Sequence, residues 1–213
     1  MIQIQKFTFN LFSENTFALW DDESKECAIV DPGCSDADEE NELAGFINEK
    51  KLIVKYLINT HCHIDHILGC EFVKQKFNPV YYAPELDVPL IENAKMQADM
   101  VGMDFSISIL PEKYLTEEEV LMIGKSKLKF LFTPGHTPGE FCIYIPDIKT
   151  CITGDVLFFD SIGRTDLWGG NYDTLFNSIN EKLLILPDET IIFPGHGEQS
   201  TIGREKKFNP FLQ

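Results

Sequence analysis

The stretch THCHIDHILG, Thr60 to Gly69, holds three of the five histidines in this chain of 213 residues. It follows the apolar run LIVKYLIN, which predicts a buried strand. In an extended segment, residues two apart point to the same side, so His61 and His63 share one face. Asp65 and His66 come next, at the predicted turn from strand to helix. Imidazole and carboxylate groups bind zinc, iron and manganese, so this stretch predicts a metal site.

The other two histidines lie in loops that follow predicted strands. His136 stands in TPGHTPG after KLKFLF, and His196 stands in FPGHGEQ after TIIF. Asp155 in CITGD has the same placement. Loops at strand ends commonly carry functional residues. Since every histidine falls into HxHxDH or onto one of two glycine-flanked loops, we expect a single metal site that uses them all.

The order of predicted elements indicates an α/β fold. IQIQKFTFN, TFALWD and ECAIVDPG predict three antiparallel strands, and residues 36–51 predict a helix. Asp65 is expected to cap a helix that runs to about residue 77, and residues 84–102 are expected to be mostly helical. VLMIG, KLKFLFT, EFCIYIPD and KTCITGD predict further strands, before a helix over residues 172–184 and a strand TIIFPG. This order predicts two packed sheets with helices outside, a four-layer αββα sandwich.

The composition and the start of the sequence limit which binding partners and which cellular compartment we expect. The net charge of −16 disfavours nucleic acid and anionic membranes as partners. The start MIQIQKFTFN lacks the basic and apolar regions of a signal peptide, and no stretch approaches the roughly 18 apolar residues of a membrane span. The six cysteines form no CxxC pair and no export signal is visible, so we expect reduced thiols and a cytoplasmic protein. No repeat or linker divides the sequence, which predicts a single domain over residues 1–213.

The motif HxHxDH, followed in order by GHT, GD and GHG, resembles the metallo-β-lactamase superfamily over nearly the whole chain. The resemblance implies the αββα fold and two divalent metal ions, foremost zinc, with iron or manganese as alternatives. By motif position, the ligands would be His61, His63 and His136 for one ion, Asp65, His66 and His196 for the other, and Asp155 as a bridge. Such sharing leaves a position on each ion for a water, as in an open catalytic site.

This ligand set implies hydrolysis by a metal-bridging hydroxide. Zinc lowers the pKa of a bound water from 15.7 to about 7, so the reaction needs no serine or cysteine nucleophile. We assign catalytic roles to Asp65, as a partner for the proton of the hydroxide, and to Asp155, as the bridge between the ions.

The segments around the ligands also resemble short glyoxalase II-like hydrolases. TGD at Asp155, LFFDSIGRTDLWGG and GHGEQSTIGREKKFNPFL carry this likeness, which implies cleavage of a small thioester such as S-lactoylglutathione. Class B β-lactamases lack an aspartate at the bridging position. Arg164 falls near a lysine that glyoxalase II uses for glutathione, so it either binds a substrate carboxylate or pairs with Asp166. The helical C-terminal substrate domain of glyoxalase II is expected to be absent.

An oxidoreductase is the alternative. Cys62 and the wider NTHCH also resemble persulfide dioxygenases, which hold a single iron through the positions of His61, His136 and Asp155.

Overall fold

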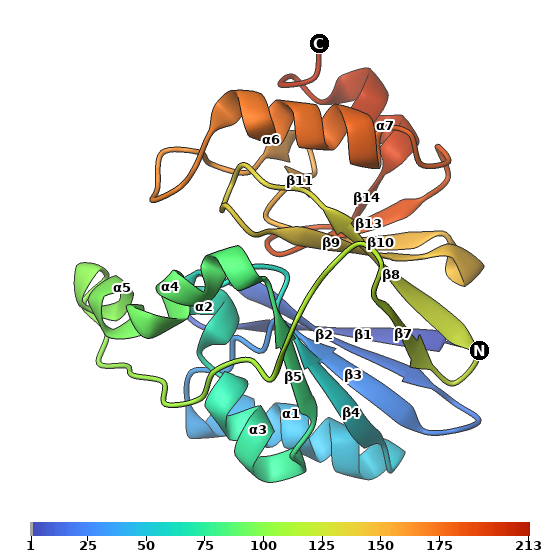
Figure 1. The fold of residues 1–213 in the computed structure, drawn as a ribbon. Helices are drawn as coiled ribbons and strands as arrows, with labels where there is room; N and C mark the ends of the chain where they lie inside the picture. Colours follow the sequence, from blue (N-terminus) through green and yellow to red (C-terminus); the bar gives the residue numbers. More distant parts are fainter. Residues whose placement is uncertain (1) are drawn as a thin grey trace. The chain divides into compact units, whose positions relative to one another are not determined.

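The computed structural model of the chain describes residues 2–213. The chain divides into two compact units. Unit 1 runs from the first strand to Tyr114 and takes in Met122–Ser126, whereas unit 2 holds Leu115–Leu121 and Lys127–Gln213. Two six-stranded sheets form, the first within unit 1 and the second mainly within unit 2 (Figure 1). The single domain expected from the sequence stays a prediction.

The first sheet has the strand order β1-β2-β3-β4-β5-β6. Its strands are β1 (Ile2–Phe9), β2 (Glu14–Asp21), β3 (Glu26–Val30), β4 (Ile53–Ile58), β5 (Val80–Ala83) and β6 (Lys113–Tyr114). The first three pair antiparallel, as predicted, and β3 to β6 pair parallel. Because parallel strands end at the same edge, β3 and β4 deliver Asp31 and Thr60 side by side.

Helix α1 (Ala37–Lys50) confirms the predicted helix over residues 36–51. The Asp36 carboxylate accepts hydrogen bonds from the backbone N–H groups of Asp38 and Glu39, which caps the first turn. The helix ends at Lys51, whose left-handed backbone (φ 56°) brings its N–H back to the last turn.

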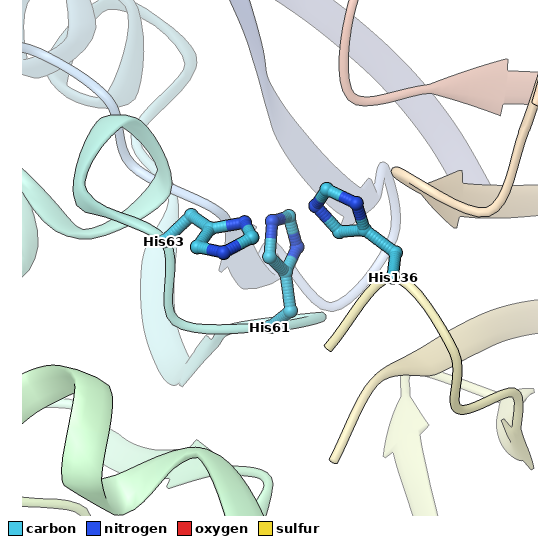
Figure 2. A group of neighbouring side chains, drawn as sticks. All are labelled: His61, His63 and His136. Atoms are coloured by element: carbon cyan, nitrogen blue, oxygen red, sulfur yellow. The ribbon is translucent and has the colours of Figure 1, made fainter. Parts of the chain in front are cut away.

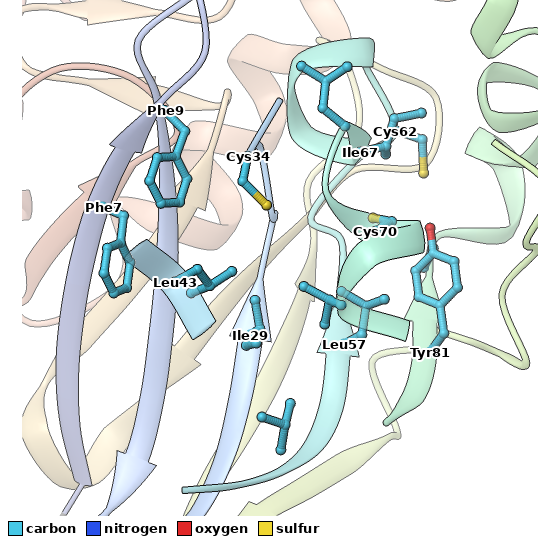
Figure 3. Close-up of a cluster of buried hydrophobic side chains, with 14 of the residues drawn as sticks. Phe7, Phe9, Ile29, Cys34, Leu43, Leu57, Cys62, Ile67, Cys70 and Tyr81 are labelled. Carbon is cyan, nitrogen blue, oxygen red and sulfur yellow. The ribbon is translucent and has the colours of Figure 1, made fainter. Parts of the chain in front are cut away.

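The core of unit 1 joins this helix to the sheet. Leu43 and Ile47 of α1 are buried in one apolar cluster with side chains of β1, β3, β4 and β5, and each contributes about 1.5–3 kcal/mol by its burial. Figure 3 shows part of this cluster, with Phe7, Phe9, Ile29, Leu43, Leu57 and Tyr81 among its members.

The helix after β4 departs from the prediction. We expected Asp65 to cap one helix up to residue 77, but α2 (Ile64–Ile67) begins after His63 and Asp65 lies inside its first turn. The helix α3 (Cys70–Phe77) starts separately after Gly69. The Gly69 N–H donates to the Pro32 carbonyl at 2.7 Å, and a Cβ at Gly69 would meet the Cys34 sulfur at 2.2 Å. The chain therefore turns at this close contact, which interrupts the helix.

Residues 84–102 are mostly helical, as predicted, but in three short pieces. A 3₁₀ turn (Glu85–Asp87) leads into α4 (Val88–Glu92) and α5 (Ala94–Met100), and Asn93 between the two helices has a non-helical backbone. The strands β5 and β6 were not predicted, because the sequence around them carries no alternating apolar pattern long enough to indicate a strand.

The second sheet has the order β14-β13-β10-β9-β8-β7. Its strands are β7 (Val120–Ile123), β8 (Ser126–Phe132), β9 (Phe141–Ile145), β10 (Thr150–Gly154), β13 (Ile191–Pro194) and β14 (Ser200–Thr201). Five of these match predicted strands, and β14 was missed. A separate hairpin of β11 (Leu157–Phe158) and β12 (Ser161–Ile162), also missed, follows β10. The strands β10 and β13 pair parallel, so their C-terminal ends meet at one edge.

Two helices cover apolar side chains of unit 2. α6 (Tyr172–Ser178) continues into a π-helical turn (Ile179–Leu183), which confirms the predicted helix over residues 172–184. The short helix α7 (Ile202–Phe208) was not predicted. Leu175, Ile179 and Ile202 pack in one cluster with the buried thiols of Cys142 and Cys151.

All six cysteines fall within residues 2–213 and are buried with free thiols, as expected from the sequence. Among the helices of that same range, none is long and apolar enough to cross a membrane.

Candidate metal centre

The first group of predicted ligands follows strand β4 in unit 1. His61 and His66 are fully buried and His63 is nearly so. The ring of His61 lies 5.0 Å from that of His63 and 4.1 Å from that of His66, between centroids. Asp65 Oδ2 lies 3.8 Å from His66 Nε2. The structure therefore brings these four side chains together, as their spacing in the sequence predicts.

Asp31, which the sequence analysis did not single out, contacts the residues that carry and orient these ligands. Its fully buried carboxylate accepts hydrogen bonds from the Thr60 N–H at 2.7 Å and from the Thr60 hydroxyl at 2.6 Å. Its Oδ2 also lies 3.3 Å from His66 Nδ1. The signal that could have found it is an acidic residue that directly follows the apolar run ECAIV.

Thr60 links Asp31 to His61 and fixes the orientation of the His61 ring. The hydroxyl gives its proton to Asp31, so its oxygen accepts the Nδ1–H of His61, 3.2 Å away. That hydrogen bond places the lone pair of the His61 ring on Nε2, the form in which imidazole binds a metal ion. The sequence left open whether Thr60 orients the turn or merely ends the strand, and these contacts favour the orienting role.

Glu14 is a second buried carboxylate beside this group. It accepts a hydrogen bond from the Thr16 hydroxyl at 2.9 Å, and its other oxygen lies 3.9 Å from His66 Nδ1. Burial raises the pKa of Glu14 well above its usual range, although the neighbouring His66 opposes the shift.

The side chains of Asn10 and Gln97 hold the backbone that carries the first group of predicted ligands. The Asn10 side chain donates to the carbonyl of Asp65 at 3.1 Å and to that of Gly33 at 2.9 Å. The Gln97 side chain accepts from the Ile64 N–H at 3.1 Å. Together these hydrogen bonds hold the loop in one geometry.

Cys62 does not belong to the group of ligands. Its side chain packs in the core of unit 1, near Cys70 and Ile67 (Figure 3), and burial raises the pKa of its thiol well above the usual range. Its backbone N–H donates to Asp87 at 3.2 Å. The thiol is therefore an inert core group, and the motif NTHCH places it away from the imidazoles on either side.

The second group of predicted ligands lies at strand ends in unit 2. His136 follows β8, Asp155 follows β10 and His196 follows β13. The Asp155 Oδ2 atom lies 3.5 Å from His136 Nε2 and 3.6 Å from His196 Nε2. His136 Nδ1 lies 2.7 Å from the carbonyl oxygen of Arg164, so this nitrogen donates and Nε2 carries the lone pair.

The predicted ligands form three sets that could hold a metal ion: His61, His63 and His136; His61, His66 and Asp155; and Asp65, His66 and His196. Figure 2 shows the imidazoles of the first set. Neutral imidazole and carboxylate are the ligands that zinc and iron accept, so the chemistry of the donors fits a divalent ion.

Arg164 forms the ion pair that the sequence offered as one of two roles. Its guanidinium donates to both oxygens of Asp166, at 2.7 and 2.9 Å, and both side chains are largely exposed. The pair lowers the pKa of Asp166 to about 2. A carboxyl group with a lowered pKa keeps its charge until the pH falls to that value, so the pair stays intact at neutral pH. Substrate binding by Arg164 remains a prediction.

Comparisons with known proteins agree with this fold. Residues 10–196 match the metallo-beta-lactamase superfamily. The hydroxyacylglutathione hydrolase GloC of Haemophilus influenzae is 39% identical over 213 residues, which span 99% of this chain and 98% of the relative.

Two solved structures are similar along their full length. The BLEG-1 B3 metallo-beta-lactamase has a TM-score of 0.90 at 32% identity, covering 99% of this chain and 100% of its own. TTHA1623 in a di-iron-bound form has a TM-score of 0.87 at 32% identity, covering 98% and 100%. The α/β fold predicted from the sequence is confirmed, and the chain belongs to the metallo-β-lactamase superfamily of metal-dependent hydrolases.

Proposed function

We propose that this chain is a binuclear metal-dependent hydrolase of small thioesters. The observation that carries the proposal is the position of the Asp155 carboxylate. One of its oxygens lies almost equally far from His136 Nε2 and His196 Nε2, at 3.5 and 3.6 Å. A carboxylate oxygen this close to both imidazoles could contribute to binding an ion held by either ring, and so could serve as a shared ligand.

The chain would hold the two ions with seven side chains. His61, His63 and His136 would bind one ion, Asp65, His66 and His196 the other, and Asp155 both. Zinc and iron both suit these donors, and a relative, TTHA1623, was solved in a di-iron-bound form. When bound, such ions supply a hydroxide nucleophile near neutral pH and an electrophile for a carbonyl oxygen.

Residues of the chain orient the imidazole ligands and accept the proton. The Arg164 carbonyl and the Thr60 hydroxyl orient His136 and His61 so that each ring presents Nε2. Asp65, whose side chain is 13% exposed, is reached by solvent while the Asn10 amide fixes its backbone carbonyl. We assign Asp65 the acceptance of the proton released during attack, in addition to its role as a ligand.

The proposed substrate is a 2-hydroxyacyl thioester such as S-lactoylglutathione. The support is the likeness to a hydroxyacylglutathione hydrolase along nearly the full length of both chains. A thiolate leaving group needs little protonation, so the reaction does not require a dedicated general acid. The net charge of −16 disfavours nucleic acid and anionic membranes as partners, and we propose a small-molecule substrate and a cytoplasmic location.

Metal analysis of protein purified without added metal tests the binuclear site. We expect two divalent ions per chain, and about one in His66→Ala and in His196→Ala. Asp22→Asn, which changes an exposed aspartate of unit 1, is the control and should keep two. If both histidine variants kept two ions and full activity, the assignment of the second ion would be wrong.

A pair of assays tests the reaction. Loss of thioester absorbance should follow addition of S-lactoylglutathione, and Asp155→Ala should reduce kcat/KM by about 10²-fold or more. In parallel, oxygen uptake is followed with glutathione persulfide as substrate. Oxygen consumption without thioester cleavage, together with one iron per chain, would replace the hydrolase by a persulfide dioxygenase.

A further inference from the structure

We infer that Glu140 is a positioning residue that sets the spacing of two proposed metal ligands, His136 and Asp155. The inference rests on the proposed function, because it concerns the same metal centre. Glu140 is 0% exposed, in a chain whose net charge is already −16. A buried carboxylate requires hydrogen bonds that compensate for its lost hydration, so its contacts indicate what it does.

The side chain of Glu140 fixes the turn that carries Asp155. In this turn the Val156 N–H donates to the Thr153 carbonyl at 3.0 Å, and Gly154 adopts a left-handed backbone with φ 49°. The N–H at the third position of such a turn has no acceptor within the turn. That N–H belongs to Asp155, and it donates to Glu140 Oε1 at 2.7 Å. A charged acceptor at this distance makes a strong hydrogen bond, which holds the backbone of the proposed bridging ligand.

The main chain of Glu140 closes the loop that carries His136. The Glu140 carbonyl accepts the N–H of Thr133 at 2.9 Å, at the base of the loop. Within the loop, the Gly135 N–H donates to the carbonyl of Thr137 at 2.9 Å.

One residue therefore ties the two ligand segments together. Its main chain holds the loop of His136 and its side chain holds the turn of Asp155. The distance of 3.5 Å between His136 Nε2 and Asp155 Oδ2 follows from these two attachments. A shift of either segment would change the separation of two donors that have to meet the same ion.

Metal titration of the full chain tests this role. Zn²⁺ affinity is measured by competition with a chromophoric chelator in the parent, Glu140→Ala and Glu140→Gln. Loss of a residue that orients a ligand typically weakens metal binding by about 10–100-fold, which is the loss expected for Glu140→Ala. Glu140→Gln keeps an oxygen acceptor without the charge, so its affinity should lie between those of the parent and Glu140→Ala.

Glu205 provides a matched control in the same unit. It is also 0% exposed and accepts a backbone N–H, that of Asp160, at 2.9 Å. Glu205→Ala should lower thermal stability but keep the Zn²⁺ affinity of the parent. The visible absorption of bound Co²⁺, which reports coordination geometry, should change in Glu140→Ala and remain unchanged in Glu205→Ala.

Parental Zn²⁺ affinity and Co²⁺ spectrum in folded Glu140→Ala would overturn the inference. If circular dichroism shows that this variant does not fold, Glu140→Gln decides: parental affinity overturns the inference and weakened affinity supports it. Both readouts use the metal ion alone. Failure of thioester hydrolysis would therefore contradict the proposed substrate without affecting the inference about Glu140. Parental metal binding in the Glu140 variants would contradict that inference without affecting the proposed substrate.

Discussion

Asp31→Ala should destabilise the metal-free protein far more than the loss of the same hydrogen bonds would at the surface. The carboxylate accepts from the N–H and the hydroxyl of Thr60, and both residues are fully buried. Truncation leaves two buried donors without this acceptor. Each such loss costs about 1–3 kcal/mol, so the free energy of unfolding should fall by about 4 kcal/mol.

The matched control is Asp36→Ala. Asp36 also accepts two hydrogen bonds, from the N–H groups of Asp38 and Glu39, but it is exposed at the start of α1. Water replaces a lost cap there, so the expected destabilisation is about 1 kcal/mol. Urea unfolding in the presence of a chelator measures both variants, and the chelator removes any contribution from bound metal. If Asp31→Ala were no more destabilising than Asp36→Ala, the argument that burial makes these bonds important would fail.

Arg164→Glu should raise KM for an anionic thioester more than it lowers kcat, because it removes binding common to the ground and transition states. Asp166→Ala should lower KM, since it releases the guanidinium from its partner 2.7 Å away, and unchanged KM in both variants would leave Arg164 a structural role alone. Glu14→Gln should stabilise the metal-free protein increasingly as pH rises above 4.5, the usual pKa of this group. Burial raises the folded pKa of Glu14, so only the unfolded chain releases its proton there and the stability of the parent falls. Urea titrations at about pH 5 and about pH 8 measure this, and an equal gain at both values would contradict it. Chromogenic cephalosporin should be turned over with kcat/KM below about 10⁴ M⁻¹s⁻¹, since an aspartate, Asp155, stands at the proposed bridging position; a higher value would overturn this expectation.

The predicted ligands could be found in the sequence because each kind of residue is scarce or distinctively placed. The five histidines fall within HxHxDH or directly after a strand, and strand ends determine where side chains gather. The residues that orient them were harder to recognise. Asp31 and Glu140 are two of many acidic residues in a chain with 34, and nothing local separates a buried carboxylate from an exposed one. Their roles depend on partners 29 and 15 positions away.

Helices and strands with a long periodic pattern were predicted from the sequence, and those with a short pattern were not. The strands β1 and β8 alternate over most of their length, and the helix α1 has both an apolar face and a capping aspartate. By contrast, β6, β12 and β14 have two residues each, too few to show any period. The break at Gly69 was missed because it depends on a contact with Pro32 and Cys34, which lie far back in the sequence.

The strand order of the first sheet has a consequence for how the chain folds during synthesis. Every strand from β1 to β6 pairs with its neighbour in sequence, so the sheet is complete by residue 114, with loops, helices or both between successive strands. Local pairing of this kind lowers contact order and favours fast folding. Since N-terminal segments emerge first from the ribosome, this sheet can assemble before the C-terminal half is made. Four of the seven proposed metal ligands would then be in place on the nascent chain, ready for an ion before the last three have been translated.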